Sequence, residues 1–183
     1  MTEKVILVDS NDTVIGEMEK LEAHQKAQLH RAVSVFIFNS KGELLLQKRA
    51  ESKYHSPGLW TNTACTHPKP NERNEDAAAR RLDEEMGINQ TKLTKLFDFI
   101  YKEKFENGLT EYEFDHVFVG VSNAIPIPEP TEVCDFEHID CERLLVKIQK
   151  SPDNYTVWFK KIVNRVFSEL KICDLTKNEN DEN

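Results

Sequence analysis

The sequence predicts an α/β domain in which a mixed sheet is flanked by helices. Short apolar runs rich in β-branched residues alternate with amphipathic segments, and they lack the regular strand–helix–strand spacing of an all-parallel sheet. The chain has 183 residues, a usual size for one domain. We therefore expect a single domain over residues 1–170 and a disordered tail over residues 171–183.

The N-terminal part contains three predicted strands. The first covers residues 4–9, and the polar segment 17–29 after it is either helix or loop. Residues 31–38 are almost continuously apolar, which predicts a strand buried on both faces. A turn at residues 39–42, which ends in a glycine suited to positive φ, leads into the next strand at 43–49.

A long loop and a helix follow. Residues 51–73 are rich in Pro, Thr, Asn, His and Trp, which indicates a loop of the kind that carries function. Residues 74–86 predict a helix that Asn74 caps and Gly87 ends. The same patterns predict strands at 96–105, 110–121 and 134–140 and helices at 141–149 and 155–170.

The charge balance limits the partners. Lys and Arg number 24 and Asp and Glu number 32, so the net charge is -8 and the pI is about 5.3. Nucleic acids and anionic membrane surfaces attract positive proteins, so we expect neither as a partner, although a local basic pocket is compatible with this balance. The chain has no apolar N-terminal segment, no membrane-length apolar stretch and no C-x-x-C pair, and we expect it in the cytoplasm.

The predicted helix carries a first candidate pair. Ala78, Leu82 and Met86 form its apolar stripe, and Arg81 and Glu85 flank that stripe one turn apart. From the helix alone, a solvated ion pair explains both charges. A cleft beside the helix would instead make them functional.

Three acidic residues lie on one face of the strand predicted at 110–121. Glu111, Glu113 and Asp115 share this face, which continues with valines. Adjacent carboxylates at the rim of a core repel one another unless they share a cation or a proton. The pattern therefore fits either metal or acid–base chemistry, or an exposed edge of the sheet.

The histidines and one cysteine complete a possible metal shell. His24 and His30 are six residues apart, so one helix could not direct both to one ion, whereas a loop leading into a strand could. Cys65 and His67 share a face if their segment is extended. Each histidine alone fits a hydrogen-bonded surface residue. Three histidines and two glutamates together would form a shell of nitrogen and oxygen ligands suited to Mn, Mg, Zn or Fe. These residues are His24, His30, His67, Glu111 and Glu113.

Several segments, in order, resemble the type 1 isopentenyl-diphosphate δ-isomerase family. The most specific is Pro57–Pro68, which contains W-T-N-x-x-C-x-H-P, and the similarity extends over residues 4–165. Three other segments carry the resemblance, namely 21–30 with its two histidines, 74–77 and the E-x-E of 111–113. The resemblance implies a Nudix-type mixed sheet with an added N-terminal segment and C-terminal helices.

Residues 72–88 resemble a degraded Nudix box. Thr66 stands where a Nudix hydrolase has the first glycine of the box, and Arg81 stands where it has a glutamate. A cation in place of a metal-binding carboxylate should impair hydrolysis and help to hold a diphosphate intact. These departures favour the isomerase over a hydrolase of a nucleotide-linked diphosphate, and a non-enzymatic metal-binding module is the third alternative.

The resemblance implies an enzyme that interconverts isopentenyl and dimethylallyl diphosphate by protonation and deprotonation, a 1,3-allylic shift in isoprenoid biosynthesis. It implies a divalent metal, either Mn, Mg or Zn, on His24, His30, His67, Glu111 and Glu113. It implies Cys65 and Glu113 as the catalytic pair, assisted by Tyr101. It further implies that Glu85 holds a Mg ion against the diphosphate. The implied contacts to the diphosphate are Lys20, Arg49, Lys53 and Arg81, and the implied hydrocarbon pocket lies beside Trp158.

Overall fold

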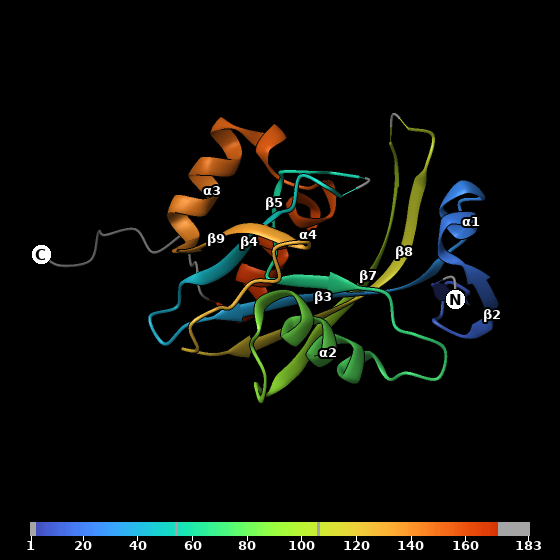
Figure 1. Cartoon of the computed structure of the whole chain (residues 1–183), viewed down its shortest axis with the longest axis horizontal. Coiled ribbons are helices and arrows are strands. Elements are labelled where there is room, and N and C mark those ends of the chain that lie inside the picture. The colour runs from blue at the N-terminus through green and yellow to red at the C-terminus, as the bar shows by residue number, and fades with distance from the viewer. Residues whose placement is uncertain (1–2, 54, 106, 172–183) are drawn as a thin grey trace, which may run out of the picture.

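The computed structural model describes residues 3–53, 55–105 and 107–171, so the expected tail lies outside the described residues except for Lys171. Within these ranges, a mixed nine-stranded sheet is flanked by helices, as predicted (Figure 1). The strands are β1 (Lys4–Val8), β2 (Val14–Glu19), β3 (His30–Phe38), β4 (Leu44–Arg49), β5 (Trp60–Thr61), β6 (Ala64–Thr66), β7 (Leu93–Lys104), β8 (Thr110–Val121) and β9 (Val133–Ile139). The helices are α1 (Lys20–Gln25), α2 (Asn74–Met86), α3 (Cys141–Lys150), the 3-10 turn η1 (Pro152–Asn154) and α4 (Val157–Leu170).

Strand β3 lies at the centre of the sheet and is buried on both faces, as predicted. It pairs parallel with β8 and antiparallel with β1, β4 and β6. Its side chains alternate between two cores: Val33, Val35 and Ile37 contact one, and Phe36 and Phe38 contact the other. Burying each of these side chains contributes roughly 1.5–3 kcal/mol, so this strand anchors both layers.

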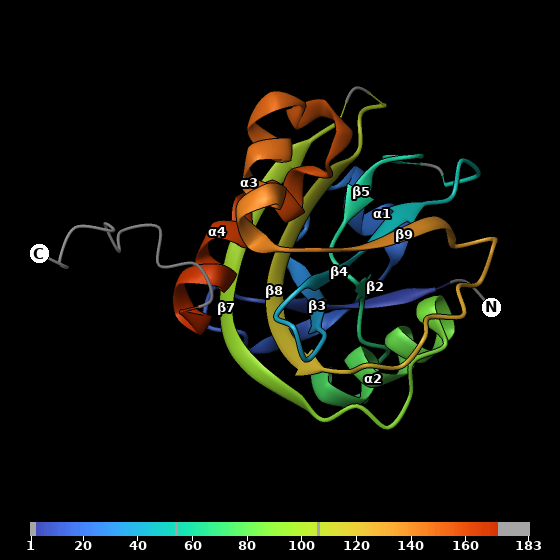
Figure 2. The ribbon, with the colours of Figure 1, turned by 90° about the vertical axis from the view of Figure 1, so that its left-hand side faces the viewer.

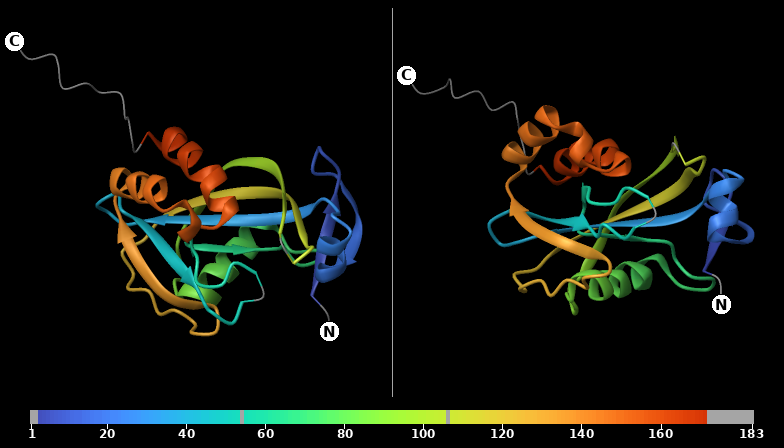
Figure 3. Two further views of the ribbon diagram at one scale, coloured as in Figure 1. Left: turned by 90° about the horizontal axis from the view of Figure 1, so that it is seen from above. Right: turned by 45° about the horizontal axis from the view of Figure 1, so that its top comes forward.

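The two cores lie on opposite sides of the sheet. Helix α2 covers one face, and helices α3 and α4 cover the other (Figures 2 and 3). On the α4 side, Phe159 stacks on Phe36 with ring centroids 6.0 Å apart. On the α2 side, Leu82 and Met86 are fully buried, as the predicted stripe requires. Residues of β3 and β8 that face α4 therefore lie in a deep layer between sheet and helix.

Helix α2 ends as predicted but begins differently. Gly87 has φ +64°, and an added Cβ would lie 2.9 Å from Ile127, so glycine is required there. The prediction that Asn74 caps the helix was wrong, because Asn74 is its first residue. Arg73 has the extended cap conformation and makes no capping hydrogen bond through its side chain.

The predicted loop 51–73 contains two short strands that the sequence pattern did not reveal. Strands β5 and β6 have only two and three residues, too few for a readable alternation. Strand β6 pairs with β3 and sets Cys65 opposite Ser34. The loop is therefore tied to the centre of the sheet at its cysteine.

The N-terminal hairpin of β1 and β2 is fastened to the central strands through Asp12. Its carboxylate lies 2.6 Å from Nε of Arg31 and 3.2 Å from Nε2 of His116. The ambiguous segment 17–29 forms the end of β2 and helix α1, which packs on β1 through Ala23. The fastened hairpin fixes α1, and with it His24. No described helix is long and apolar enough to cross a membrane.

Candidate active site

Three histidines and one glutamate converge at the end of the sheet nearest α1. His24 comes from α1, His30 begins β3, His67 follows β6 and Glu113 lies on β8. One potential ligand atom from each lies within 4.8 Å of the others. The parallel pairing of β3 with β8 places His30 beside Glu113. The expectation of a loop for His24 was wrong, because it lies on helix α1, and the turn between α1 and β3 brings it to His30.

Backbone carbonyls orient two of these imidazoles. Nδ1 of His24 lies 2.8 Å from the carbonyl of Lys20, and Nδ1 of His30 lies 2.8 Å from the carbonyl of Gln28. Each Nδ1 therefore donates, and Nε2 keeps its lone pair. Within the described chain, Nε2 of His30 is buried and has no hydrogen-bond partner. The same outer contacts orient metal-bound histidines.

The protonation states also suit a cation. Burial lowers the pKa of His67 to about 4 and lowers the pKa of His24, so both are neutral at pH 7. Burial disfavours ionisation of Glu113, but contacts with His30 and His67 outweigh it and hold its pKa well below the usual range. Neutral imidazoles and a carboxylate are the donors that a divalent metal requires. The cluster can therefore hold one divalent metal ion.

Glu111 and Glu113 form a pair of carboxyl groups that are 4% and 7% exposed, which rules out the exposed-edge interpretation of this strand. Burial and the charge of Glu113 raise the pKa of Glu111 far above its ordinary value. Glu111 is outside the group of four closest ligands and lies 3.8 Å from His55. One carboxyl is therefore neutral and its neighbour is charged.

Tyr101 connects the two carboxyl groups. Its hydroxyl lies 2.6 Å from Oε2 of Glu113 and 3.0 Å from Oε2 of Glu111. A phenol has one proton, so it donates to the charged Glu113 while a protonated Glu111 can donate to the phenol oxygen. Burial raises the pKa of Tyr101, which keeps the hydroxyl protonated. The three groups form a short chain along which a proton can be held near Glu113.

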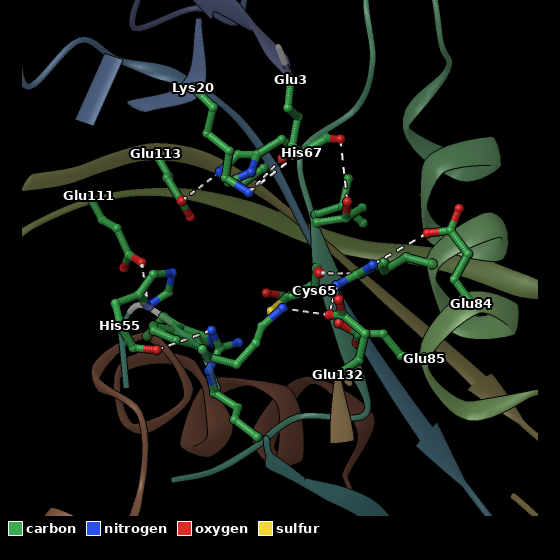
Figure 4. A pocket seen from close by; sticks show the side chains of 18 of the residues that line it. Glu3, Lys20, His55, Cys65, His67, Glu84, Glu85, Glu111, Glu113 and Glu132 are labelled. Atoms are coloured by element: carbon green, nitrogen blue, oxygen red, sulfur yellow. Dashed lines mark hydrogen bonds and ion pairs between the residues drawn. The ribbon is translucent and has the colours of Figure 1, made fainter. Parts of the chain in front are cut away.

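Cys65 lies between two charged groups of side chains. Figure 4 shows Glu113 and His67 on one side of it and Glu85 and Glu132 on the other. Its thiol is free, and burial raises its pKa to about 12. The thiol therefore carries its proton at neutral pH and has the form of an acid.

The second charged group centres on Arg81. Nη2 of Arg81 lies 2.6 Å from Oε1 of Glu85, which is only 2% exposed, and it also contacts Glu132. Gln47 donates to the other oxygen of Glu85 at 2.7 Å. Burial raises the pKa of Glu85 and Arg81 opposes this. Glu85 is buried and Arg81 is partly buried beside the cavity, so the solvated interpretation drawn from the helix alone was wrong.

A cavity of about 380 Å³ joins both groups. Its apolar wall is the indole of Trp158, with the guanidinium of Arg49 5.4 Å from the ring centroid. His55 packs its edge against the same indole at 5.8 Å between centroids. The wall combines an aromatic face with a cation, a setting for an apolar chain attached to an anion.

The cavity brings the residues implied by the resemblance together. All of them line it except His24 and His30, which lie against the ring of His67. Lys20 pairs with Glu3 at 3.2 Å, and Lys53 pairs with Glu132 at 2.6 Å. Sequence reasoning missed Glu132, His55 and Gln47. His55 lies five residues before the W-T-N segment, and this position was its only signal.

Comparisons with known proteins find relatives that align with most of the chain. A family model described as NUDIX domain matches residues 28–159. The "Isopentenyl-diphosphate Delta-isomerase 2" of Photorhabdus laumondii is 51% identical over 164 residues, which cover 90% of this chain and 92% of that protein. A protein of the same name from Aromatoleum aromaticum is 48% identical over 168 residues, covering 92% of this chain and 88% of that protein.

Solved structures share the fold. A Deinococcus radiodurans protein superposes with a TM-score of 0.75 at 24% identity, covering 89% of this chain and 98% of that one. A MutT protein from Methanosarcina mazei gives a TM-score of 0.64 at 23% identity, covering 78% and 96%. These likenesses concern the arrangement of the sheet and helices, which is the mixed sheet that the sequence predicts.

Proposed function

The chain belongs to the NUDIX domain family and to the isopentenyl-diphosphate Delta-isomerases, and we propose that the cavity around Cys65 is where it performs the isomerisation. The enzyme interconverts isopentenyl and dimethylallyl diphosphate in isoprenoid biosynthesis. The single observation that carries the assignment of the site is the position of Cys65, a protonated thiol, across from the ionised Glu113.

The reaction needs an acid and a base on opposite sides of an allylic unit. The Cys65 thiol gives its proton to the terminal alkene carbon, which leaves positive charge on the tertiary carbon. Glu113 removes a proton from the neighbouring methylene, and the double bond forms in its new place. In the reverse direction the two residues exchange roles. Each positioned proton transfer contributes typically 10²–10⁴-fold.

Trp158 and Tyr101 support this exchange. The face of the indole favours a nearby cation by about 0.5–2 kcal/mol and excludes water that would trap it. The Tyr101 hydroxyl, 2.6 Å from Glu113, holds that carboxylate in place and stabilises its charged form. Both side chains are less than 8% exposed, so the chemistry is shielded from solvent.

We assign one divalent ion, Mn, Mg or Zn, to His24, His30, His67, Glu111 and Glu113, and Mg with the diphosphate to Glu85. As a metal ligand, Glu111 would have to release its proton. When bound, such ions supply positive charge that fixes a carboxylate and offsets a polyanion. The diphosphate contacts assigned to this chain are Lys20, Arg49, Lys53 and Arg81, which make a basic pocket within an acidic protein. The partner is a small isoprenoid diphosphate.

The test follows isopentenyl diphosphate by NMR in deuterated buffer with Mg. We expect dimethylallyl diphosphate to form with deuterium incorporated, and we expect Cys65→Ala to abolish both signals. Cys134→Ala is the matched control, because that exposed thiol lies outside the cavity and should leave turnover unchanged.

Other products would point to the alternatives. Release of phosphate or nucleoside monophosphate from a nucleotide substrate would identify a hydrolase. Metal-dependent melting without turnover would identify a binding module. Unchanged isomerisation in Cys65→Ala would refute the acid–base assignment while leaving the family intact.

A further inference from the structure

Glu132 joins two cations at the phosphate end of the cavity. Its Oε2 lies 2.6 Å from Nζ of Lys53, and the same oxygen contacts Nη2 of Arg81. All three side chains are between 19% and 23% exposed and line the cavity. The carboxylate therefore sits between two groups that a diphosphate would have to reach.

The fold fixes this arrangement through Ala50. The backbone N–H of Ala50 donates to the carbonyl of Glu132 at 2.9 Å, which extends the pairing of β4 with β9 by one residue. The carbonyl of Ala50 accepts from the N–H of Lys53 at 3.2 Å, which closes the turn after β4. The register of the two strands shifts next to Arg49. The same alanine thus positions both partners of the ion pair.

We propose that Glu132 is a displaceable carboxylate that holds Lys53 and Arg81 in their binding positions and gives way to the substrate diphosphate. The inference rests on the proposed function and adds a residue that regulates affinity at the same site. Carboxylate and phosphate oxygens make the same charge-assisted contacts with Arg and Lys, so one can replace the other.

The charges explain why displacement lowers affinity. In the absence of a ligand, the carboxylates of Glu85 and Glu132 balance the charges of Arg81 and Lys53. An incoming diphosphate meets a carboxylate at contact distance from the cations it needs. Like charges held this close repel one another, which opposes binding of the diphosphate. Removing the charge of Glu132 while keeping an oxygen acceptor should therefore strengthen binding.

The main experiment measures inorganic pyrophosphate binding by calorimetry to the full chain in EDTA. We expect Glu132→Gln to bind pyrophosphate about tenfold more tightly than wild type, because the repulsion is removed and solvent screening limits the gain. Glu137→Gln is the matched control, because it removes the same charge from β9, where Glu137 pairs with Lys147. We expect its affinity to equal that of wild type. Equal or weaker binding by Glu132→Gln would overturn the inference.

A second variant tests the displacement itself, and its effect in the wild-type background can be measured whether or not Glu132→Gln folds. In wild type, Lys53→Met removes a phosphate contact and the Glu132 contact together, so we expect less than a threefold loss of pyrophosphate affinity. In the Glu132→Gln background we expect Lys53→Met to reduce pyrophosphate affinity by a factor at least five times larger than in wild type. A large loss in wild type, or equal losses in both backgrounds, would show that the residues act independently and would refute displacement.

The same titrations separate the inference from its premise. If wild type binds pyrophosphate and Glu132→Gln gains nothing, only the role of Glu132 fails. If no variant binds pyrophosphate with or without Mg, the diphosphate site of the proposed function is refuted, and the inference is refuted with it.

Discussion

Arg81 and Glu85, one turn apart on α2, form an ion pair in which Nη2 lies 2.6 Å from a carboxylate that is 2% exposed. Removing one partner of such a pair leaves a buried charge without compensation. We expect Arg81→Met to lower the free energy of unfolding by about 3 kcal/mol, measured by urea denaturation.

Arg73→Met, at the N-cap of the same helix, is the control. Arg73 pairs with Asp76, and its side chain is 72% exposed. An exposed pair contributes at most about 1 kcal/mol, so the free energy of unfolding should change little. If both substitutions lower the free energy of unfolding by the same amount, the ion pair of Arg81 with Glu85 does not stabilise the fold as the burial of Glu85 implies.

The contrast between these arginines shows the limit of sequence reasoning. Periodicity placed Arg81 and Glu85 at the border of the stripe, but it could not show that Gln47 covers them from β4 and Glu132 from the turn before β9. Alternation did place Glu111, Glu113 and Asp115 on one face, because a strand fixes side-chain direction locally. The partners of a side chain across the fold depend on register, which no local pattern encodes.

Cys65 should be a slow thiol despite its place in the cavity. Burial raises its pKa to about 12, so the reactive thiolate is scarce at pH 8, whereas Cys134 is exposed. We expect iodoacetamide at pH 8 to modify Cys134 at least tenfold faster, as measured by peptide mass spectrometry. Faster labelling of Cys65 would show a lowered pKa and would argue against an acid that holds its proton.

The histidine cluster should make stability depend on a metal. His30 presents a buried Nε2 to the group, and a ligand that binds only the folded state raises its melting temperature. We expect Zn or Mn to raise the melting temperature of wild type and EDTA to reverse the rise. His30→Ala should lose this response, while His138→Ala, on β9 outside the cluster, should keep it. A response that survives in His30→Ala would locate the metal elsewhere.

Asp115 should make stability fall with rising pH. It is 1% exposed, accepts from Ser34 at 2.7 Å, and has its pKa raised from 3.8 to about 8, first by burial and then by Glu113. Between pH 3.8 and about 8, the folded chain holds a proton on Asp115 that the unfolded chain lacks. The contribution of Asp115 to the free energy of unfolding is therefore largest below pH 3.8 and is lost as the pH approaches 8.

Asp115→Asn tests this linkage in urea unfolding at pH 5, 6.5 and 8. The amide has the same shape and does not ionise, so we expect the variant to gain stability relative to wild type as the pH rises. Each proton contributes at most about 1.4 kcal/mol per pH unit. A constant difference across the three pH values would show that Asp115 is ionised throughout.

The site as a whole was predictable only in part. The segment W-T-N-x-x-C-x-H-P is contiguous, so the sequence alone indicated that Cys65 and His67 lie close together. The resemblance to a family indicated the site residues that are distant in the sequence. Glu132 and His55 had no such signal, because a single acid in a proline-rich loop and a single histidine fit a surface equally well. Only the pairing of β4 with β9 and the packing against Trp158 reveal that both face the cavity.

Tyr101→Phe tests the proton chain between Glu111 and Glu113. The Tyr101 hydroxyl lies 2.6 Å from Glu113, the proposed base, and its hydrogen bonds involve none of the residues assigned to the diphosphate. Its loss should therefore affect the chemical step and not substrate binding. We expect kcat to fall by roughly 10–100-fold with KM within a factor of two, and the pH profile of kcat to shift because Glu113 loses a donor that stabilises its charge. Tyr112→Phe, on the opposite face of β8, should leave both constants unchanged. A rise in KM with unchanged kcat would assign Tyr101 to substrate binding, and unchanged kinetics would remove it from the mechanism.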